Sequence, residues 1–157
     1  MSDAFVTATK EFSWDMSHML AEHEGLCLNV HGHTYVMHVT VYHKPPYKLE
    51  PAGPACGMVV DFKGLKEVVK ELIVDPLDHA FMGWEHSPDT VEQMIIALLR
   101  KHGRKHQLVG YRPTAENMAI NFLKMINAKL EELGAGYEVG CVKVWETPTS
   151  FAEATLQ

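Results

Sequence analysis

Apolar and polar side chains alternate along two stretches in the first third of the chain. Residues 4–14, AFVTATKEFSW, are rich in β-branched and aromatic side chains, which favour a strand. From His33 to Tyr42 apolar residues recur at every second position, a period that also predicts a strand. The apolar positions of this second stretch are Tyr35, Met37, Val39 and Val41. Between the two strands, residues 15–26 predict a turn or a short helical piece.

Two further strands are predicted from shorter signals. Residues 43–57, HKPPYKLEPAGPACG, are rich in proline and glycine and predict a loop. The following MVVDF (58–62) predicts a short strand that ends at Asp61, a residue suited to cap the next helix. Near the C-terminus, YEVGCVKVWET (137–147) predicts the last strand.

Three helices are predicted between these last two strands. In the first, apolar residues recur at i, i+3, i+4, i+7 and i+8 and share one helical face: Leu65, Val68, Val69, Leu72 and Ile73. We expect Asp75-Pro76 to end this helix. The second helix is DTVEQMIIALLRKHG (89–103). The third begins after Pro113-Thr114 and ends near Gly134, a residue suited to a left-handed helix terminus.

The predicted elements follow the order β, β, β, α, α, α, β. Because the strands and helices are segregated into blocks, the fold class is predicted to be α+β, with an antiparallel four-stranded sheet and helices on one face. The chain has 157 residues, of which 46% are hydrophobic. This size and composition fit a single domain, 1–157, with its own core.

Charge and cysteine usage exclude several classes of protein. A net charge of −6 disfavours nucleic acid or an anionic membrane as the main partner. No apolar run approaches the roughly 20 residues that span a bilayer, and MSDAFVTATKEF (1–12) lacks the layout of a secretory signal. The cysteines Cys27, Cys56 and Cys141 cannot all pair, which favours reduced thiols and a cytoplasmic location.

Histidine is the unusual residue of the composition, with ten in the chain. His31 and His33, in the stretch CLNVHGHTY, project from the same face of a strand. By itself such a pair is explained equally well as two polar residues at the start of a strand. It predicts a metal site only if a third ligand comes from another element. An antiparallel first strand would bring His18 near the pair, while His23, in a more polar setting, is the alternative. Three neutral histidines leave a fourth position of Zn²⁺ open, as in catalytic zinc sites.

Five short blocks occur in order along the chain. They are FSWDMSH with CLNVHGH (12–33), GMVVDFKGLK (57–66), LDHAFM (77–82), RPTAENMA (112–119) and VKVWETPTSFAEA (142–154). Together they resemble the 6-pyruvoyltetrahydropterin synthase / 6-carboxytetrahydropterin synthase family, and five collinear blocks are far more specific than any one. The resemblance implies the tunnelling fold (T-fold), in which subunits join their sheets into an oligomeric barrel, a trimer or hexamer.

The resemblance assigns a metal site and a thiol. It implies that His18, His31 and His33 bind a zinc ion, which would hold and acidify the hydroxyl groups of the substrate side chain. Cys27 matches the family's catalytic cysteine, a base once its pKa is lowered. From the residues alone, a free cysteine is more often a small buried side chain.

Further site residues also follow from the resemblance. Asp78 and His79 match a catalytic pair in which a carboxylate supports a proton-transferring imidazole, although the sequence alone favours a helix-ending turn there. Since the two are neighbours, only the local turn can bring their side chains together. Glu146 matches the glutamate that accepts two N–H bonds from the pterin, with an exposed strand-end glutamate as the alternative. Thr114 and Glu116 are secondary substrate-binding candidates, and helix capping alone explains Thr114.

The spacing of Cys27 and His31, with three residues between them, is typical of family members that make the queuosine precursor. The resemblance therefore implies conversion of 7,8-dihydroneopterin triphosphate to 6-carboxy-5,6,7,8-tetrahydropterin, with release of acetaldehyde and triphosphate. The alternatives are a 6-pyruvoyltetrahydropterin synthase, which eliminates triphosphate without C–C cleavage, and a non-catalytic zinc- or pterin-binding protein.

One segment departs from the pattern expected of compact bacterial members. An extra helical insertion is expected at about 84–111, where it would cover the pocket entrance or alter an oligomer contact. It carries the basic cluster 100–106, which is typical of a solvated helix end more than of a phosphate-steering patch. If the family's oligomer forms, the Asp78-His79 pair is able to complete a neighbouring subunit's site.

Overall fold

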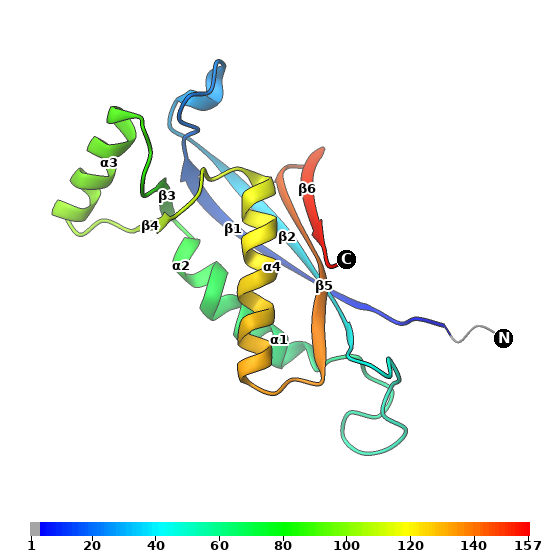
Figure 1. Ribbon diagram of the computed structural model, residues 1–157. Coiled ribbons are helices and arrows are strands. Elements are labelled where there is room, and N and C mark those ends of the chain that lie inside the picture. Colours follow the sequence, from blue (N-terminus) through cyan, green and yellow to red (C-terminus); the bar gives the residue numbers. More distant parts are fainter. Residues whose placement is uncertain (1–3) are drawn as a thin grey trace.

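The computed structural model describes residues 4–157. Residues 1–3, part of the segment in which we expect no secretory signal, lie outside the described residues. Six strands form one sheet in the order β4-β3-β1-β2-β5-β6 (Figure 1). The strands are β1 (Ala8–His18), β2 (His31–His43), β3 (Ala80–Trp84), β4 (His106–Val109), β5 (Tyr137–Thr147) and β6 (Ser150–Thr155). The neighbours β1, β2, β5 and β6 are antiparallel, whereas β3 is parallel to β1 and β4 is parallel to β3.

The fold is α+β, as predicted, but the prediction of four antiparallel strands is wrong because the sheet is mixed and has six. β3 and β4 are short, and β3 is buried at four consecutive positions, so it lacks the alternation that marks a half-buried strand. β6 follows β5 after only two residues, and the apolar pattern does not separate the two strands.

β1 and β2 form the long antiparallel ladder that carries the site. Buried side chains alternate along β1 through Trp14, Met16 and His18, so this strand ends at His18 and not at residue 14 as predicted. The ladder pairs His18 with His31, the first residue of β2. The predicted antiparallel approach of these two strand ends is therefore confirmed.

A β-bulge in β5 decides which of its side chains face the site. Val139 pairs with Val41 and Val142 pairs with Val39, and both β5 residues are buried. The two residues are three positions apart on β5, whereas their partners are two positions apart on β2. One extra residue in a strand reverses the facing of all residues beyond it. The bulge thereby places Glu146 on the helix-covered face of the sheet.

A continuous helical segment follows Asp61, whose side chain accepts a hydrogen bond from the Lys63 N–H (2.9 Å). The segment comprises α1 (Phe62–Val69), the π-helical η2 (Lys70–Val74) and α2 (Asp75–Leu77). Asp75-Pro76 lies in the last turn of this segment, which ends at Leu77, so the predicted end is confirmed to within one residue. The Asp75 N–H donates to the Lys70 carbonyl, and this wider π turn precedes the proline, which would clash in a regular α-helix.

The predicted strand at residues 58–62 is also wrong. Val59 and Val60 are buried against the core, but they join no ladder of the sheet, and Phe62 already begins α1. A short apolar run fits a buried irregular segment as well as a strand, so its pattern does not distinguish them. Between β1 and β2, the expected helical piece is the 3₁₀ turn η1 (Leu26–Leu28).

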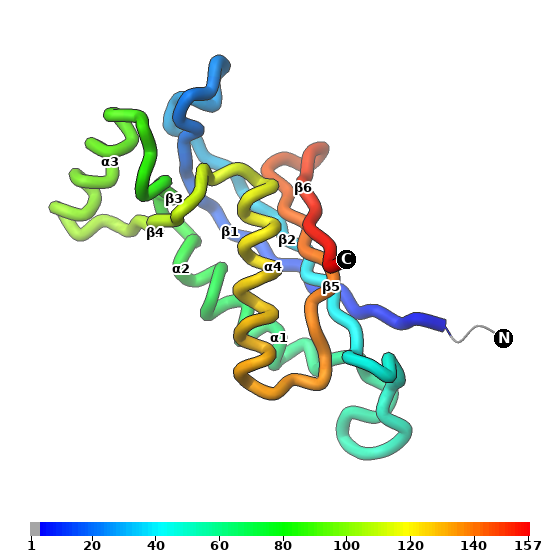
Figure 2. Tube along the Cα trace, in the orientation of Figure 1, coloured from blue at the N-terminus to red at the C-terminus, as the bar shows by residue number. Residues whose placement is uncertain are grey.

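The helices cover both faces of the sheet. α4 (Ala115–Glu132) and the α1–α2 segment contact each other on one face, where they enclose the main core (Figures 1 and 2). α3 (Thr90–Lys101) lies apart from them, and its Ile96 packs with Phe81 in a separate cluster, whereas Met82 belongs to the main core. Helices on one face only were predicted, which is wrong for α3. Since β3 is apolar on both faces, both require cover.

The ends of the two later helices agree with the sequence signals. Asp89 caps α3 by accepting from the N–H groups of Val91 and Glu92, and Gly134 follows α4 with φ of 67°. Residues 84–111, expected as an extra helical insertion, contain α3 and also β4. Among the described residues, no helix combines the length and apolar character needed to cross a membrane.

Candidate active site

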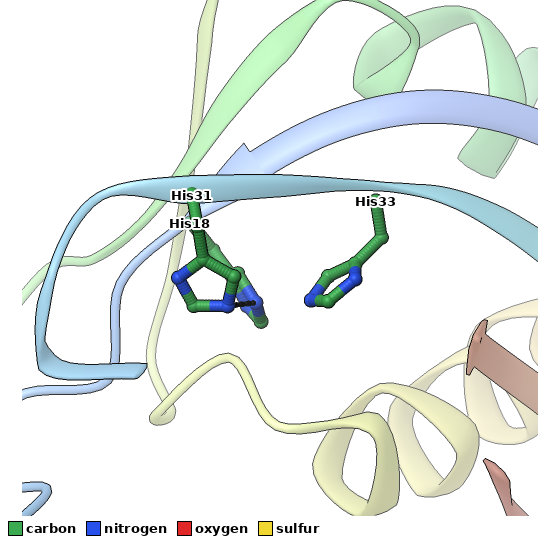
Figure 3. Close-up of side chains that lie close together, drawn as sticks. All are labelled: His18, His31 and His33. Carbon is green, nitrogen blue, oxygen red and sulfur yellow. Dashed lines mark hydrogen bonds between the residues drawn. The ribbon is translucent and has the colours of Figure 1, made fainter. Parts of the chain in front are cut away.

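Three histidines converge where β1 ends and β2 begins (Figure 3). His18 and His31 are register partners, and His33 lies two residues further along β2 on the same face. One ring nitrogen from each lies within 4.8 Å of the other two, and the Nε2 atoms of His18 and His31 are 3.1 Å apart. This cluster can hold a metal ion, and it contains His18 and not the alternative, His23, whose Nδ1 accepts from the Gly25 N–H.

The outer nitrogens of two rings are bonded to backbone carbonyls. His18 Nδ1 donates to the Pro113 oxygen and His31 Nδ1 to the Asn29 oxygen, both at 2.8 Å. Such bonds fix the tautomer, so that the two Nε2 atoms face each other as lone pairs. Two facing lone pairs at 3.1 Å repel unless a cation lies between them. Two nitrogens that bind one tetrahedral zinc at 2.0–2.1 Å are about 3.3 Å apart, so the residues fit this metal.

Burial favours the neutral form that metals bind in two of the three imidazoles, those of His18 and His33. Burial lowers the pKa of His18 to about 4, although the bond to the Pro113 carbonyl opposes this shift, and positive charge on the other two imidazoles would lower it further. Burial also lowers the pKa of His33, against the opposing charge of Glu146. At neutral pH both rings therefore offer lone pairs.

Tyr35 and Glu146 lie beside this cluster. The Tyr35 hydroxyl donates to Glu146 Oε1 at 3.5 Å and lies 3.3 Å from His18 Nε2, while the carboxylate is 3.9 Å from the same nitrogen. Tyr35 is fully buried, and this burial, followed by the charge of Glu146, raises the pKa of its hydroxyl. The phenol thus remains a neutral donor directed at the carboxylate.

A cavity opens where β2 and β5 separate. Their ladder ends at the pair Val36–Trp145, beyond which the two strands diverge. The cavity has a volume of about 510 Å³, and its lining includes Glu146 and His33 as well as Trp145. A volume of this order fits a small organic ligand. Such a ligand would be within reach of the Glu146 carboxylate and of His33.

Cys27 lies in η1, on the connection that joins the histidine-bearing ends of β1 and β2. It is half-buried, and its carbonyl accepts a hydrogen bond from the Leu20 N–H at 2.8 Å, which closes the connection. Cys27 therefore lies at the same end of the β1–β2 pair as the histidine cluster.

The Asp78-His79 pair precedes β3 at the edge of β1. His79 has φ of 61°, a left-handed conformation that brings its Nδ1 to 3.0 Å from Asp78 Oδ1. The same oxygen accepts the Asp15 N–H at 3.1 Å, and that bond, followed by the interaction with His79, lowers the pKa of Asp78. The expected need for a special local turn is therefore confirmed.

The pair does not contact the thiol or the three histidines. No hydrogen bond or ion pair joins Asp78 or His79 to Cys27 or to the histidine cluster within residues 4–157. A cavity of about 440 Å³ is lined by both His79 and His33. Within one chain, then, the Asp78-His79 pair and the histidine cluster border a common cavity without touching.

The sequence matches the family described as 6-pyruvoyl tetrahydropterin synthase over residues 7–157. The chain belongs to this family. A relative from Haemophilus influenzae, named 6-carboxy-5,6,7,8-tetrahydropterin synthase, is 39% identical over 145 residues, which cover 92% of this chain and 95% of the relative. Another relative of that name, from Synechocystis, is 38% identical over 143 residues, which cover 91% of this chain and 88% of the relative. The chain is accordingly an enzyme of this synthase family.

The family's fold is also seen in a solved structure. The 6-pyruvoyl tetrahydropterin synthase of Caenorhabditis elegans superposes with a TM-score of 0.65 at 21% identity, covering 97% of this chain and 96% of that one. This likeness supports the assignment of the fold and carries no information about the substrate.

The block RPTAEN reaches the site in a way that the sequence did not indicate. The Thr114 hydroxyl accepts the Asn117 N–H at 3.3 Å and caps α4, while Glu116 is exposed in the first helical turn. Neither contacts the histidine cluster in the described chain, whereas the carbonyl of Pro113 orients His18. A backbone group leaves no signal in side-chain identity. Tyr35 was predicted only as an apolar residue of the strand. Its position two residues after His33 puts it on the same face as the histidines, and this signal would have identified it as a neighbour of the cluster.

Proposed function

We propose that this enzyme is a zinc-dependent lyase that converts 7,8-dihydroneopterin triphosphate to 6-carboxy-5,6,7,8-tetrahydropterin, releasing acetaldehyde and triphosphate. The observation that carries the proposal is the histidine cluster with two opposed lone pairs, next to a cavity that is lined by both His33 and Glu146. The product is chosen because relatives that align over nearly the whole chain carry the 6-carboxy name.

His18, His31 and His33 would hold the zinc ion through one nitrogen each. When bound, zinc would supply Lewis-acid stabilisation to the hydroxyl oxygens of the substrate side chain. The chain's own contribution is to orient the His18 and His31 rings through the carbonyls of Pro113 and Asn29, while burial keeps His18 and His33 neutral.

Glu146 would bind the pterin ring. Its carboxylate can accept two parallel N–H bonds from the ring N–H and the 2-amino group, a geometry that fixes orientation as well as position. Tyr35 would support this carboxylate from the buried side. The cavity between Glu146 and His33 would then align the substrate side chain toward the histidines.

Cys27 is proposed as the base that moves a proton at the substrate side chain, and His79, supported by Asp78, as the group that transfers the remaining protons. Because the pair does not touch Cys27 within one chain, we propose that it completes the site of a neighbouring subunit in a trimer or hexamer. Glu116 is kept as a proposed substrate contact, and Thr114 would act through the start of α4. From cysteine usage we also propose a cytoplasmic location.

Incubation with 7,8-dihydroneopterin triphosphate, followed by mass analysis of the pterin, tests the proposal. We expect the 6-carboxy product from the wild type. Cys27→Ala should lower turnover by about 10²–10⁴-fold while the zinc content stays unchanged, because this residue is not a ligand. A pyruvoyl product would support the alternative synthase, and full turnover by Cys27→Ala would refute the assignment of the base.

A further inference from the structure

Lys105 connects the segment 84–111 to the catalytic turn. It lies next to the first residue of β4, and its carbonyl accepts the Phe81 N–H at 3.3 Å, which places it beside β3. From there its ammonium group donates to the carbonyl oxygens of Asp75 (2.7 Å) and Asp78 (2.5 Å). These carbonyls are at the C-terminal end of the α1–α2 segment, where backbone oxygens lack helical partners and a cation is favoured.

The peptide unit between Asp78 and His79 is bonded at both of its polar groups. Its carbonyl accepts from Lys105, and its N–H donates to the Asp15 oxygen at 2.7 Å. This is the peptide that precedes the left-handed His79. A residue in such a conformation stays there only when its surroundings determine it. The two bonds fix the peptide plane, and this plane sets the approach of the imidazole to the carboxylate.

Lys105 differs from its basic neighbours. Arg100, Lys101 and Arg104 make no side-chain hydrogen bond or ion pair in the part of the chain that the structure describes. His106 bonds only the nearby Arg104 carbonyl. The basic cluster is therefore a solvated helix end, as the sequence favours, with the exception of one side chain that is directed at the catalytic turn.

We propose that Lys105 is a positioning residue, which holds the Asp78-His79 peptide so that the imidazole meets its carboxylate in the orientation needed for proton transfer. The proposal rests on the role given above to His79. It also gives the segment 84–111 a function: β4 places the lysine that orders the proton-transfer pair.

The first test compares Lys105→Met, which keeps the aliphatic stem, with Lys105→Arg and with the control Lys101→Met. For Lys105→Met we expect kcat to fall by about 10- to 100-fold, because a displaced catalytic group loses alignment, with KM changed by less than about twofold. Lys105→Arg should recover kcat to within about fivefold, since a guanidinium can donate to both carbonyls. Lys101→Met should match the wild type. An unchanged kcat in Lys105→Met would refute the proposal.

The second test repeats Lys105→Met in a His79→Ala background. Because Lys105 acts through His79, we expect no further loss of kcat in the double variant. Equal losses in both backgrounds would show that Lys105 serves stability alone, and would overturn the proposal.

A third measurement does not depend on the reaction. Nitrogen and proton NMR of the His79 ring should show the Nδ1–H tautomer bonded to Asp78 in the wild type and in Lys105→Arg, and tautomer exchange in Lys105→Met. If the wild type makes no pterin product but this difference is seen, the proposed function fails while the positioning role stands. An identical ring signal in all three proteins would refute the positioning role itself.

Discussion

Asn127 on α4 supports the bulge that gives Glu146 its facing. Its Nδ2 donates to the Val139 carbonyl at 2.9 Å, and its Oδ1 accepts the Val139 N–H at 2.7 Å. Val139 is fully buried, so the carboxamide satisfies two backbone groups that would otherwise have no partner at the interrupted ladder. Asn127→Ala removes both bonds and leaves the rest of the helix intact.

The size of the effect follows from these two groups. Each buried donor or acceptor left without a partner costs about 1–3 kcal/mol. Because Asn127 is only half-buried, water can replace part of the lost bonding, and we expect a total loss of about 2–4 kcal/mol in the free energy of unfolding. For a chain of this length that loss lowers Tm by roughly 5–15 °C.

Urea and thermal unfolding of the metal-free protein at fixed protomer concentration provide the assay. Asn121→Ala is the matched control. Within residues 4–157 its Nδ2 bonds only the Asn117 carbonyl of the same helix, so this variant should cost less than about 1 kcal/mol. Asn127→Ala should also raise KM, because a loosened bulge releases Glu146. Equal stability of the two variants would refute the role assigned to Asn127.

Two further outcomes are expected. His18 has a pKa of about 4 when folded and about 6.5 when unfolded, so the unfolded chain binds the proton first as pH falls. The metal-free protein should therefore lose up to about 3 kcal/mol of unfolding free energy between pH 6.5 and 4. His18→Gln should make this loss clearly smaller, with the remainder due to His33, whose pKa burial also lowers; an unchanged loss in His18→Gln would contradict the prediction. A Cβ at Gly140 would lie 2.3 Å from the Tyr42 ring, so Gly140→Ala should lower the free energy of unfolding by about 1–3 kcal/mol in a denaturant titration. Gly136→Ala, whose Cβ would have nothing within 4 Å, should be nearly neutral. Equal losses in the two variants would contradict the close packing of the β5 bulge against β2.

Much of the candidate site could be predicted because the placement of its histidines follows local rules. The period of two along β2 put His31 and His33 on one face, and an antiparallel partner strand was enough to bring His18 to them. Asp61 and Asp89 are caps whose signals are local in sequence, and they begin α1 and α3 as expected.

The parts that sequence could not supply depend on longer-range packing. β3 is buried on both faces and therefore shows no alternation, so neither the mixed sheet nor the placement of α3 on the opposite face was predictable. The facing of Glu146 depends on a single extra residue in β5. The contact between His79 and Asp78 depends on backbone bonds to Asp15, which side-chain identity does not encode.

The ratio of acetaldehyde to triphosphate released from 7,8-dihydroneopterin triphosphate by the zinc-loaded enzyme tests the proposed reaction most directly. We expect one acetaldehyde for each triphosphate, because C–C cleavage accompanies elimination in the proposed lyase. Triphosphate released without acetaldehyde would contradict the proposed reaction and indicate a pyruvoyl synthase, and release of neither product would contradict catalysis altogether.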